Sequence, residues 1–152
     1  MTRTSAIGLV VVLAAGGACG GGQDGPPAIE VDRSACDHCG MLISEPRFAA
    51  AYQAAGAGPR LFDDIGCLLD ALAREGGAPD GRFWFHDAAT AAWMPGDRAV
   101  FVESPRLRTP MASGLAAYDG ADAAGRGAAD QGGRVAGTLT DLRKRTPEGG
   151  DL

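Results

Sequence analysis

Apolar and polar positions alternate in a way that predicts one helix between short strands in the first half of the chain. Four apolar residues recur at the helical spacing i, i+3, i+4, i+7, namely Ile65, Leu68, Leu69 and Leu72. Asp64 is the expected N-cap, and Gly76-Gly77 is the expected stop. Residues 48–53, 60–62 and 82–86 are short segments of the kind that form strands. The pattern predicts the order β-β-α-β.

The second half of the chain repeats this order. Residues 99–103 and 115–118 are expected strands, 119–131 a weak Ala/Gly-rich helix, and 134–139 a closing strand. The glycine pairs at 76–77 and 132–133 follow Phe62-Asp63 and Tyr118-Asp119 at the same interval, which indicates an internal duplication. Coincidence in a Gly-rich chain is the alternative. We predict an α+β fold of two small packed β-β-α-β units, residues 31–88 and 89–145, because each unit alone is too small to bury much core.

The N-terminus has the features of an export signal. Arg3 precedes an apolar stretch at 6–15, and small residues lead to Cys19. The stretch is too short to span a bilayer. We predict a lipoprotein signal peptide at 1–18, a lipidated Cys19 with a flexible tether at 19–30, and a disordered tail at 146–152. The protein is then exported and lipid-anchored to a membrane, on a periplasmic or cell-surface face. A plain secretory signal is the alternative.

Charge and cysteine count narrow the function further. Without Arg3 the 14 basic residues become 13, against 19 acidic ones, so the net charge is about −6. No basic stripe for nucleic acid exists beyond residues 143–145, and we therefore expect no nucleic-acid partner. An exported chain that keeps three cysteines, Cys36, Cys39 and Cys67, cannot pair all of them in disulfides.

Soft sulfur side chains gather in one loop. Cys36-Asp-His-Cys39-Gly40-Met41 combines thiol and thioether, and such ligands favour Cu(I), whereas a closed zinc site is built from Cys and His. Gly40 permits a bend that turns Cys39 and Met41 to one ion. Cys36 has an alternative role, namely a redox-active disulfide with Cys39 in an oxidising compartment.

Other candidate ligands lie outside this loop or beside its sulfurs. Met111 stands in a loop outside any apolar period. Cys67 is expected in the first turn of its helix, away from the apolar stripe, where the helix dipole would lower its pKa. His38 can supply a nitrogen ligand, while His86 is expected to end a strand near the surface. Met94 lacks motif support and is expected to pack in the core.

Four motifs, in this order, resemble the NosL family of copper-binding lipoproteins. They are Cys36-x-x-Cys39-Gly-Met41, Phe62-Asp63-Asp64-Ile65-Gly66-Cys67-Leu68, Thr90-x-x-Trp93, and Thr109-Pro110-Met111 with Gly114 and Ala117-Tyr118.

The resemblance implies a membrane-anchored Cu(I) chaperone for the copper sites of nitrous oxide reductase. It also implies two β-β-α-β units related in shape to organomercurial lyase, and it supports Met111 as the ligand from the second unit. This chain departs from the family pattern at Ala112, where Gly is common. Many members carry only the second cysteine of the Cys36/Cys39 pair, so the resemblance implies that Cys36 is the less secure ligand.

Three other classes compete with a copper carrier. A thiol oxidoreductase places its Cys-x-x-Cys at the start of a helix, which the residues after Cys39 do not favour. A structural zinc site would use Cys36, Cys39, Cys67 and a His, but leaves the methionines unexplained. An enzyme of the organomercurial lyase type would need paired thiols with a nearby carboxylate, for which Asp63 or Asp64 beside Cys67 is a candidate, and fold analogy alone carries no activity. We predict a Cu(I)-binding accessory protein, not an enzyme, which serves nitrous oxide reductase or its membrane assembly complex.

Overall fold

The computed structural model describes residues 25–77 and 80–145. The predicted signal peptide, Cys19, the first part of the tether and the tail at 146–152 lie outside the described residues. Within 25–77 and 80–145, no helix has both the length and the apolar character that a membrane span requires.

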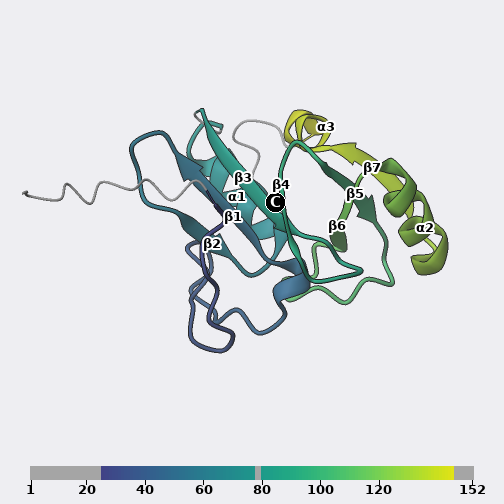
Figure 1. Ribbon diagram of the computed structural model, residues 1–152, viewed down its shortest axis with the longest axis horizontal. Helices are drawn as coiled ribbons and strands as arrows, with labels where there is room; N and C mark the ends of the chain where they lie inside the picture. Colours follow the sequence, from purple (N-terminus) through teal and green to yellow (C-terminus); the bar gives the residue numbers. More distant parts are fainter. Residues whose placement is uncertain (1–24, 78–79, 146–152) are drawn as a thin grey trace, which may run out of the picture.

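The first unit is a four-stranded antiparallel sheet in the order β2-β1-β3-β4. After a short 3-10 turn, η1 (Pro46–Phe48), come β1 (Ala50–Ala54), β2 (Arg60–Phe62), helix α1 (Ile65–Arg74), β3 (Gly81–His86) and β4 (Trp93–Pro95). Strand β1 is central, with Ala50 opposite Phe62 on one side and opposite Phe85 on the other. The loops before η1 lie below this sheet in Figure 1.

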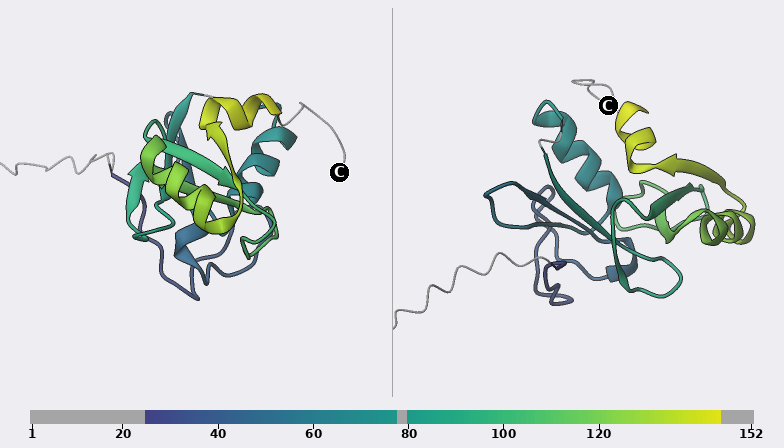
Figure 2. Two further views of the ribbon diagram at one scale, coloured as in Figure 1. Left: turned by 90° about the vertical axis from the view of Figure 1, so that its right-hand side faces the viewer. Right: turned by 45° about the horizontal axis from the view of Figure 1, so that its top comes forward.

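The second unit is a three-stranded antiparallel sheet in the order β6-β5-β7. It consists of β5 (Ala99–Glu103), β6 (Leu115–Asp119), helix α2 (Ala121–Gln131), β7 (Arg134–Thr138) and helix α3 (Leu139–Arg145). Helix α2 lies at the end of the molecule farthest from the first sheet (Figures 1 and 2).

The two units share one strand order. In each, the first strand is central, the second and third pair on either side of it, and a helix joins the second strand to the third. The α+β class is therefore confirmed, with two antiparallel sheets and their helices. A common origin by duplication stays a prediction.

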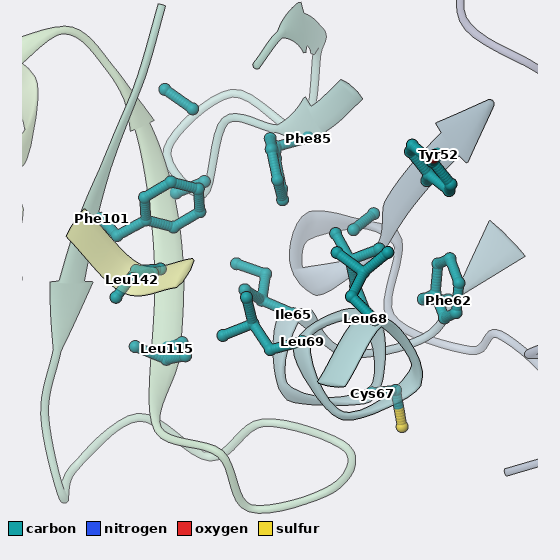
Figure 3. Close-up of a cluster of buried hydrophobic side chains, with 14 of the residues drawn as sticks. Tyr52, Phe62, Ile65, Cys67, Leu68, Leu69, Phe85, Phe101, Leu115 and Leu142 are labelled. Carbon is teal, nitrogen blue, oxygen red and sulfur yellow. The ribbon is translucent and has the colours of Figure 1, made fainter. Parts of the chain in front are cut away.

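Helix α1 lies between the two sheets and forms the centre of the core. Figure 3 shows Phe101, Leu115 and Leu142 of the second unit on one side of α1, and Tyr52 and Phe62 of the first sheet on the other. The sheets also meet directly, because the rings of Phe85 and Phe101 form an edge contact with centroids 4.9 Å apart. The two units thus share this core cluster.

The ends of α1 follow the sequence prediction. Asp64 is the N-cap, and its side chain accepts a hydrogen bond from Gly66 N at 2.7 Å. At the other end, Gly77 N donates to Leu72 O at 2.8 Å, and Gly76 and Gly77 both have positive φ, as in a helix C-cap. This short helix therefore has a defined first turn, and that turn carries Cys67.

Three elements were not predicted from the sequence, and several boundaries differ by one or two residues. Phe48 belongs to η1 and not to β1, while η1, β4 and α3 appear in addition to the expected elements. The closing strand ends at Thr138. There Asp141 Oδ2 accepts a hydrogen bond from Thr138 N at 2.8 Å, and this bond stabilises the first turn of α3, which begins at Leu139.

Candidate metal centre

The Cys36 to Met41 loop is a small hairpin closed by backbone hydrogen bonds. Ala35 and Leu42 form an antiparallel bridge, and Cys36 N donates to Met41 O at 2.8 Å. Gly40 N donates to Cys36 O at 2.9 Å, and Gly40 has φ of 76°. This left-handed conformation is the bend predicted at Gly40, and it suits glycine because a side chain would be strained there.

The hairpin is fixed to strand β2 through Asp37. Asp37 N donates to Leu61 O at 2.7 Å, and Leu61 N donates back to Asp37 Oδ2 at 2.6 Å. Because β2 runs directly on to Asp63 and helix α1, this pair of bonds sets the hairpin beside the N-terminal end of α1.

Three cysteines and one aspartate converge at this point. One ligand atom each from Cys36, Cys39, Asp63 and Cys67 lies within 4.8 Å of all the others, and we call these four residues the cysteine cluster. The Cys39 thiol donates to Asp63 Oδ1 at 3.6 Å. Four donors placed tetrahedrally about 2.3 Å from one ion lie about 3.8 Å from each other, so the most widely separated pair of the cluster must close by up to about 1 Å to share a metal.

Burial controls the chemistry of the cluster. Cys36, Asp63 and Cys67 are buried, whereas Cys39 is half-buried. Burial raises the pKa of the Cys67 thiol, and the neighbouring Cys36 and Asp63 raise it further. Burial also raises the pKa of Cys36, against the opposing effect of nearby backbone N–H groups. A metal ion would therefore displace protons as it binds.

The predicted dipole effect on Cys67 is wrong. Its sulfur does point away from the apolar stripe of α1, as expected (Figure 3). It is nevertheless enclosed, and the loss of hydration outweighs the first-turn dipole, so the pKa of this thiol rises instead of falling.

The two candidate thioethers lie outside the cysteine cluster, on the surface. Met41 is 54% exposed and Met111 is 42% exposed. A groove of about 640 Å³ has Met41 in its lining, together with Pro110 and Ala112 on either side of Met111, and Asp63 also lines it. The hairpin and the Met111 loop therefore border one groove that reaches the cluster, and their ligand roles stay predictions.

The Met111 loop, residues 109–114, is a tightly bonded turn. Thr109 Oγ1 lies 3.3 Å from Ser113 Oγ and accepts from Gly114 N at 3.2 Å, while Ala112 N donates to Thr109 O at 3.0 Å. The turn holds Ala112 at φ of 59°, a left-handed conformation that costs a residue with a Cβ roughly 1–2 kcal/mol.

Ala112→Gly should stabilise the protein by about 0.5–1 kcal/mol, because the relief of this strain exceeds the entropy that glycine loses on folding. Urea unfolding measures the change. Ala91→Gly is the matched control, since Ala91 has φ of 56° away from the groove and should gain a similar amount. A loss of stability at position 112 would contradict the strain argument.

Comparison with known proteins shows the family. A family model for NosL matches residues 28–145. The chain belongs to the NosL family. Its structure is similar to the crystal structure of the copper chaperone NosL from Shewanella denitrificans, with a TM-score of 0.58, 19% identity, and coverage of 72% of this chain and 92% of that chain. At this identity the likeness shows a shared fold. No curated protein sequence matches significantly.

One motif of this NosL chain serves the fold, away from the cysteine cluster. Thr90-x-x-Trp93 closes the turn between β3 and β4, where Asp87 Oδ1 accepts from Ala89 N at 2.7 Å and from Thr90 N at 3.1 Å. Trp93 then stacks on His86, with centroids 3.7 Å apart. This motif positions the strand pair, and neither Thr90 nor Trp93 lines the groove.

The other candidate residues of this NosL chain lie outside the cysteine cluster, except Asp63. His38 lies on the hairpin but is not one of the cluster residues. His86 ends β3 as expected, but it is buried and not at the surface, because Trp93 covers it. Met94 is buried in the core, as predicted. Asp63 is the cluster member that the sequence suggested only for an enzyme.

Proposed function

We propose that this NosL-family protein is a membrane-anchored Cu(I) chaperone, with its cargo bound at the cysteine cluster. The observation that carries the proposal is the convergence of three thiols and Asp63 within 4.8 Å beside an open groove. Soft thiolates select Cu(I), zinc and iron–sulfur clusters. Met41 in the groove lining and the exposed Met111 in the loop beside it add thioethers, which favour Cu(I) among these. The bound metal is cargo, and we propose a carrier rather than an enzyme.

The geometry supports release as well as capture. Cys36 and Cys67 are buried, while Cys39 is half-buried and donates to Asp63, which itself lines the groove. An acceptor that enters the groove would meet Met41, the loop that carries the exposed Met111, and Asp63 with its partner Cys39 before the buried thiols. Transfer would then proceed by stepwise ligand exchange, in which the weak thioethers pass the ion outward.

The acceptor that we propose is nitrous oxide reductase or its membrane assembly complex, on the basis of family membership. A lipid on Cys19 would hold the chaperone on the same membrane face as that complex. Tethering raises the effective concentration of the donor at the acceptor without any new contact between them.

Cys19→Ser should convert a membrane-associated protein into a soluble or unprocessed one, because stable anchoring depends on the acyl chains. Detergent phase partition of cell fractions measures this. The matched control is Cys39→Ser, which removes a different thiol and should leave the partition unchanged. A Cys19→Ser protein that stays in the detergent phase would contradict lipidation.

A zinc site is the second candidate, because three cysteines and one carboxylate are donors that zinc accepts. We expect the reduced protein to bind about one Cu(I), and to bind zinc much more weakly. Competition with Cu(I) and Zn(II) chelators under anaerobic conditions measures both affinities. Circular dichroism after chelation should show an intact fold, since the two sheets share a core without metal. Tight stoichiometric zinc, with unfolding on chelation, would contradict the chaperone proposal.

The disulfide alternative for Cys36 and Cys39 stays open for the oxidised protein, while the structure has all three cluster cysteines as free thiols. A thiol oxidoreductase is disfavoured, because the Cys-x-x-Cys segment lies on a hairpin between Ala35 and Leu42 and not at the start of a helix.

A further inference from the structure

We propose that Asp64 is a positioning residue that fixes the Met111 loop beside the groove and so couples the second unit to the cysteine cluster. Asp64 is fully buried between the two units. The proposal rests on the proposed function, because it explains how Met111, a candidate ligand from the second unit, is held near the cysteine cluster of the first unit.

Each oxygen of the Asp64 carboxylate has a different partner. Oδ1 accepts from Gly66 N at 2.7 Å and caps helix α1. Oδ2 accepts from Met111 N at 2.9 Å, across to the second unit. The residue before Asp64 is the cluster member Asp63, and Cys67 follows three residues later. The backbone of Met111 is therefore bonded directly to the segment that carries two of the four cluster residues.

A second contact holds the same loop on the same helix turn. A Cβ atom at Gly66 would lie 2.7 Å from Ser113 Cβ, closer than real Cβ contacts allow. Gly66 thus lets the Met111 loop pack directly against the first turn of α1. With internal bonds between Thr109 and Ser113, the loop is a rigid body bound to α1 at two adjacent points.

A helix cap alone does not require this arrangement, because capping uses one oxygen and serine provides it as well as aspartate does. The second oxygen of Asp64 is committed to the amide of Met111, the residue with the exposed thioether. Movement of the α1 turn on metal binding at Cys67 would move Met111 with it. By linkage, the position of Met111 and metal binding at the cluster influence each other reciprocally.

The chain offers a matched control in Asp87. This buried aspartate also accepts local backbone N–H groups through Oδ1, from Ala89 and Thr90, and accepts from Asp119 N of the second unit through Oδ2 at 3.1 Å. Asp87 therefore makes the same kind of link between units, at the β3–β4 turn instead of at the groove.

The test uses Asp64→Ser in the full chain, which keeps a capping hydroxyl for Gly66 N but has no second oxygen for Met111. We expect Cu(I) affinity to fall about 10-fold, the lower end for losing an outer-sphere partner, and to match the loss in Met111→Leu. The double variant should bind no more weakly than either single one, because both remove the same contribution. X-ray absorption should show the same loss of sulfur in both single variants. Asp87→Ser should lose stability but keep wild-type affinity and sulfur count.

The outcomes separate this proposal from the proposed function. If Met111→Leu weakens binding while Asp64→Ser does not, or if the two losses add, the positioning role is wrong and the chaperone proposal stands. If Met111→Leu binds Cu(I) as wild type does, Met111 is no ligand and the positioning role falls with it. An equal loss in Asp87→Ser would assign the effect to general destabilisation and overturn the positioning role.

A second variant decides the matter if Asp64→Ser does not fold. Gly66→Ala keeps Asp64 and Met111 but places a Cβ against Ser113, so the loop must shift from α1. We expect a similar loss of Cu(I) affinity that is again non-additive with Met111→Leu. Wild-type affinity in Gly66→Ala, with a folded chain, would overturn the proposal.

Discussion

Cys39→Ser should reduce Cu(I) affinity by at least about 100-fold, which is more than the 10- to 100-fold typical of losing an outer-sphere partner. Cys39 is the half-buried thiol of the cluster. It donates to Asp63 Oδ1, with 3.6 Å between sulfur and oxygen, and Asp63 lines the groove. A serine hydroxyl stays protonated and is a hard donor, so it replaces neither the charge nor the softness of a thiolate. The fold should survive, since serine has nearly the same shape and the position has access to water.

The measurement is competition against a Cu(I) chelator under anaerobic conditions, with circular dichroism to check folding. Met94→Leu is the control, because Met94 is a core methionine and this volume-conserving change should leave affinity unchanged. Met41→Leu and Met111→Leu should weaken binding only partially, and Cys36→Ser should be milder than Cys39→Ser. If Met41→Leu and Met111→Leu both bind as wild type does while Cys36→Ser and Cys67→Ser each lose binding, the site is a three-thiolate centre without methionine. Binding by Cys39→Ser within a few-fold of wild type would remove Cys39 from the site.

Phe101→Ala should destabilise the protein by about 3–5 kcal/mol, the usual cost of deleting a phenylalanine ring from a packed core. Phe101 is fully buried in the central strand β5, and its ring meets Phe85 of the first sheet in an edge contact. Deleting the ring leaves a cavity where the two units join. Because helix α1 packs against both sheets, both units should unfold together in a single transition.

Urea unfolding followed by fluorescence and by circular dichroism measures this effect. Val135→Ala is the matched control in the same sheet, since Val135 is 45% exposed and its loss should change stability by less than about 0.5 kcal/mol. Two separate transitions, or a loss near that of the control, would show that the units are independent and that α1 does not join them.

The sequence predicted those elements whose own residues carry the signal, such as apolar spacing, a helix cap or a glycine stop. The helical spacing of Ile65 to Leu72, the cap at Asp64 and the glycine stop gave α1, and the segments at 60–62 and 99–103 form strands with those bounds. Helix α3 was missed, although Thr138-x-x-Asp141 is a capping-box pattern that could have found it. Apolar periodicity predicts no helix there, because few apolar residues follow Thr138.

The site was harder to predict, because its members come from separate segments. The hairpin sulfurs were recognised from composition, but their convergence with Cys67 depends on the bonds between Asp37 and Leu61, which no spacing in the sequence encodes. The pKa of Cys67 was misjudged for the same reason, since the helix dipole is local and burial is tertiary. Asp63 carried a usable signal, namely a carboxylate four residues before a cysteine in the first turn of a helix.

X-ray absorption at the copper edge of the reduced full chain, loaded with one Cu(I) under anaerobic conditions, tests the central claim most directly. The cysteine cluster predicts that the ligands bound directly to copper are mainly sulfur. In the fraction of Cys39→Ser that still binds copper, each copper should have one sulfur ligand fewer. A shell of nitrogen and oxygen, or a sulfur shell that is identical in wild type and Cys39→Ser, would contradict the account.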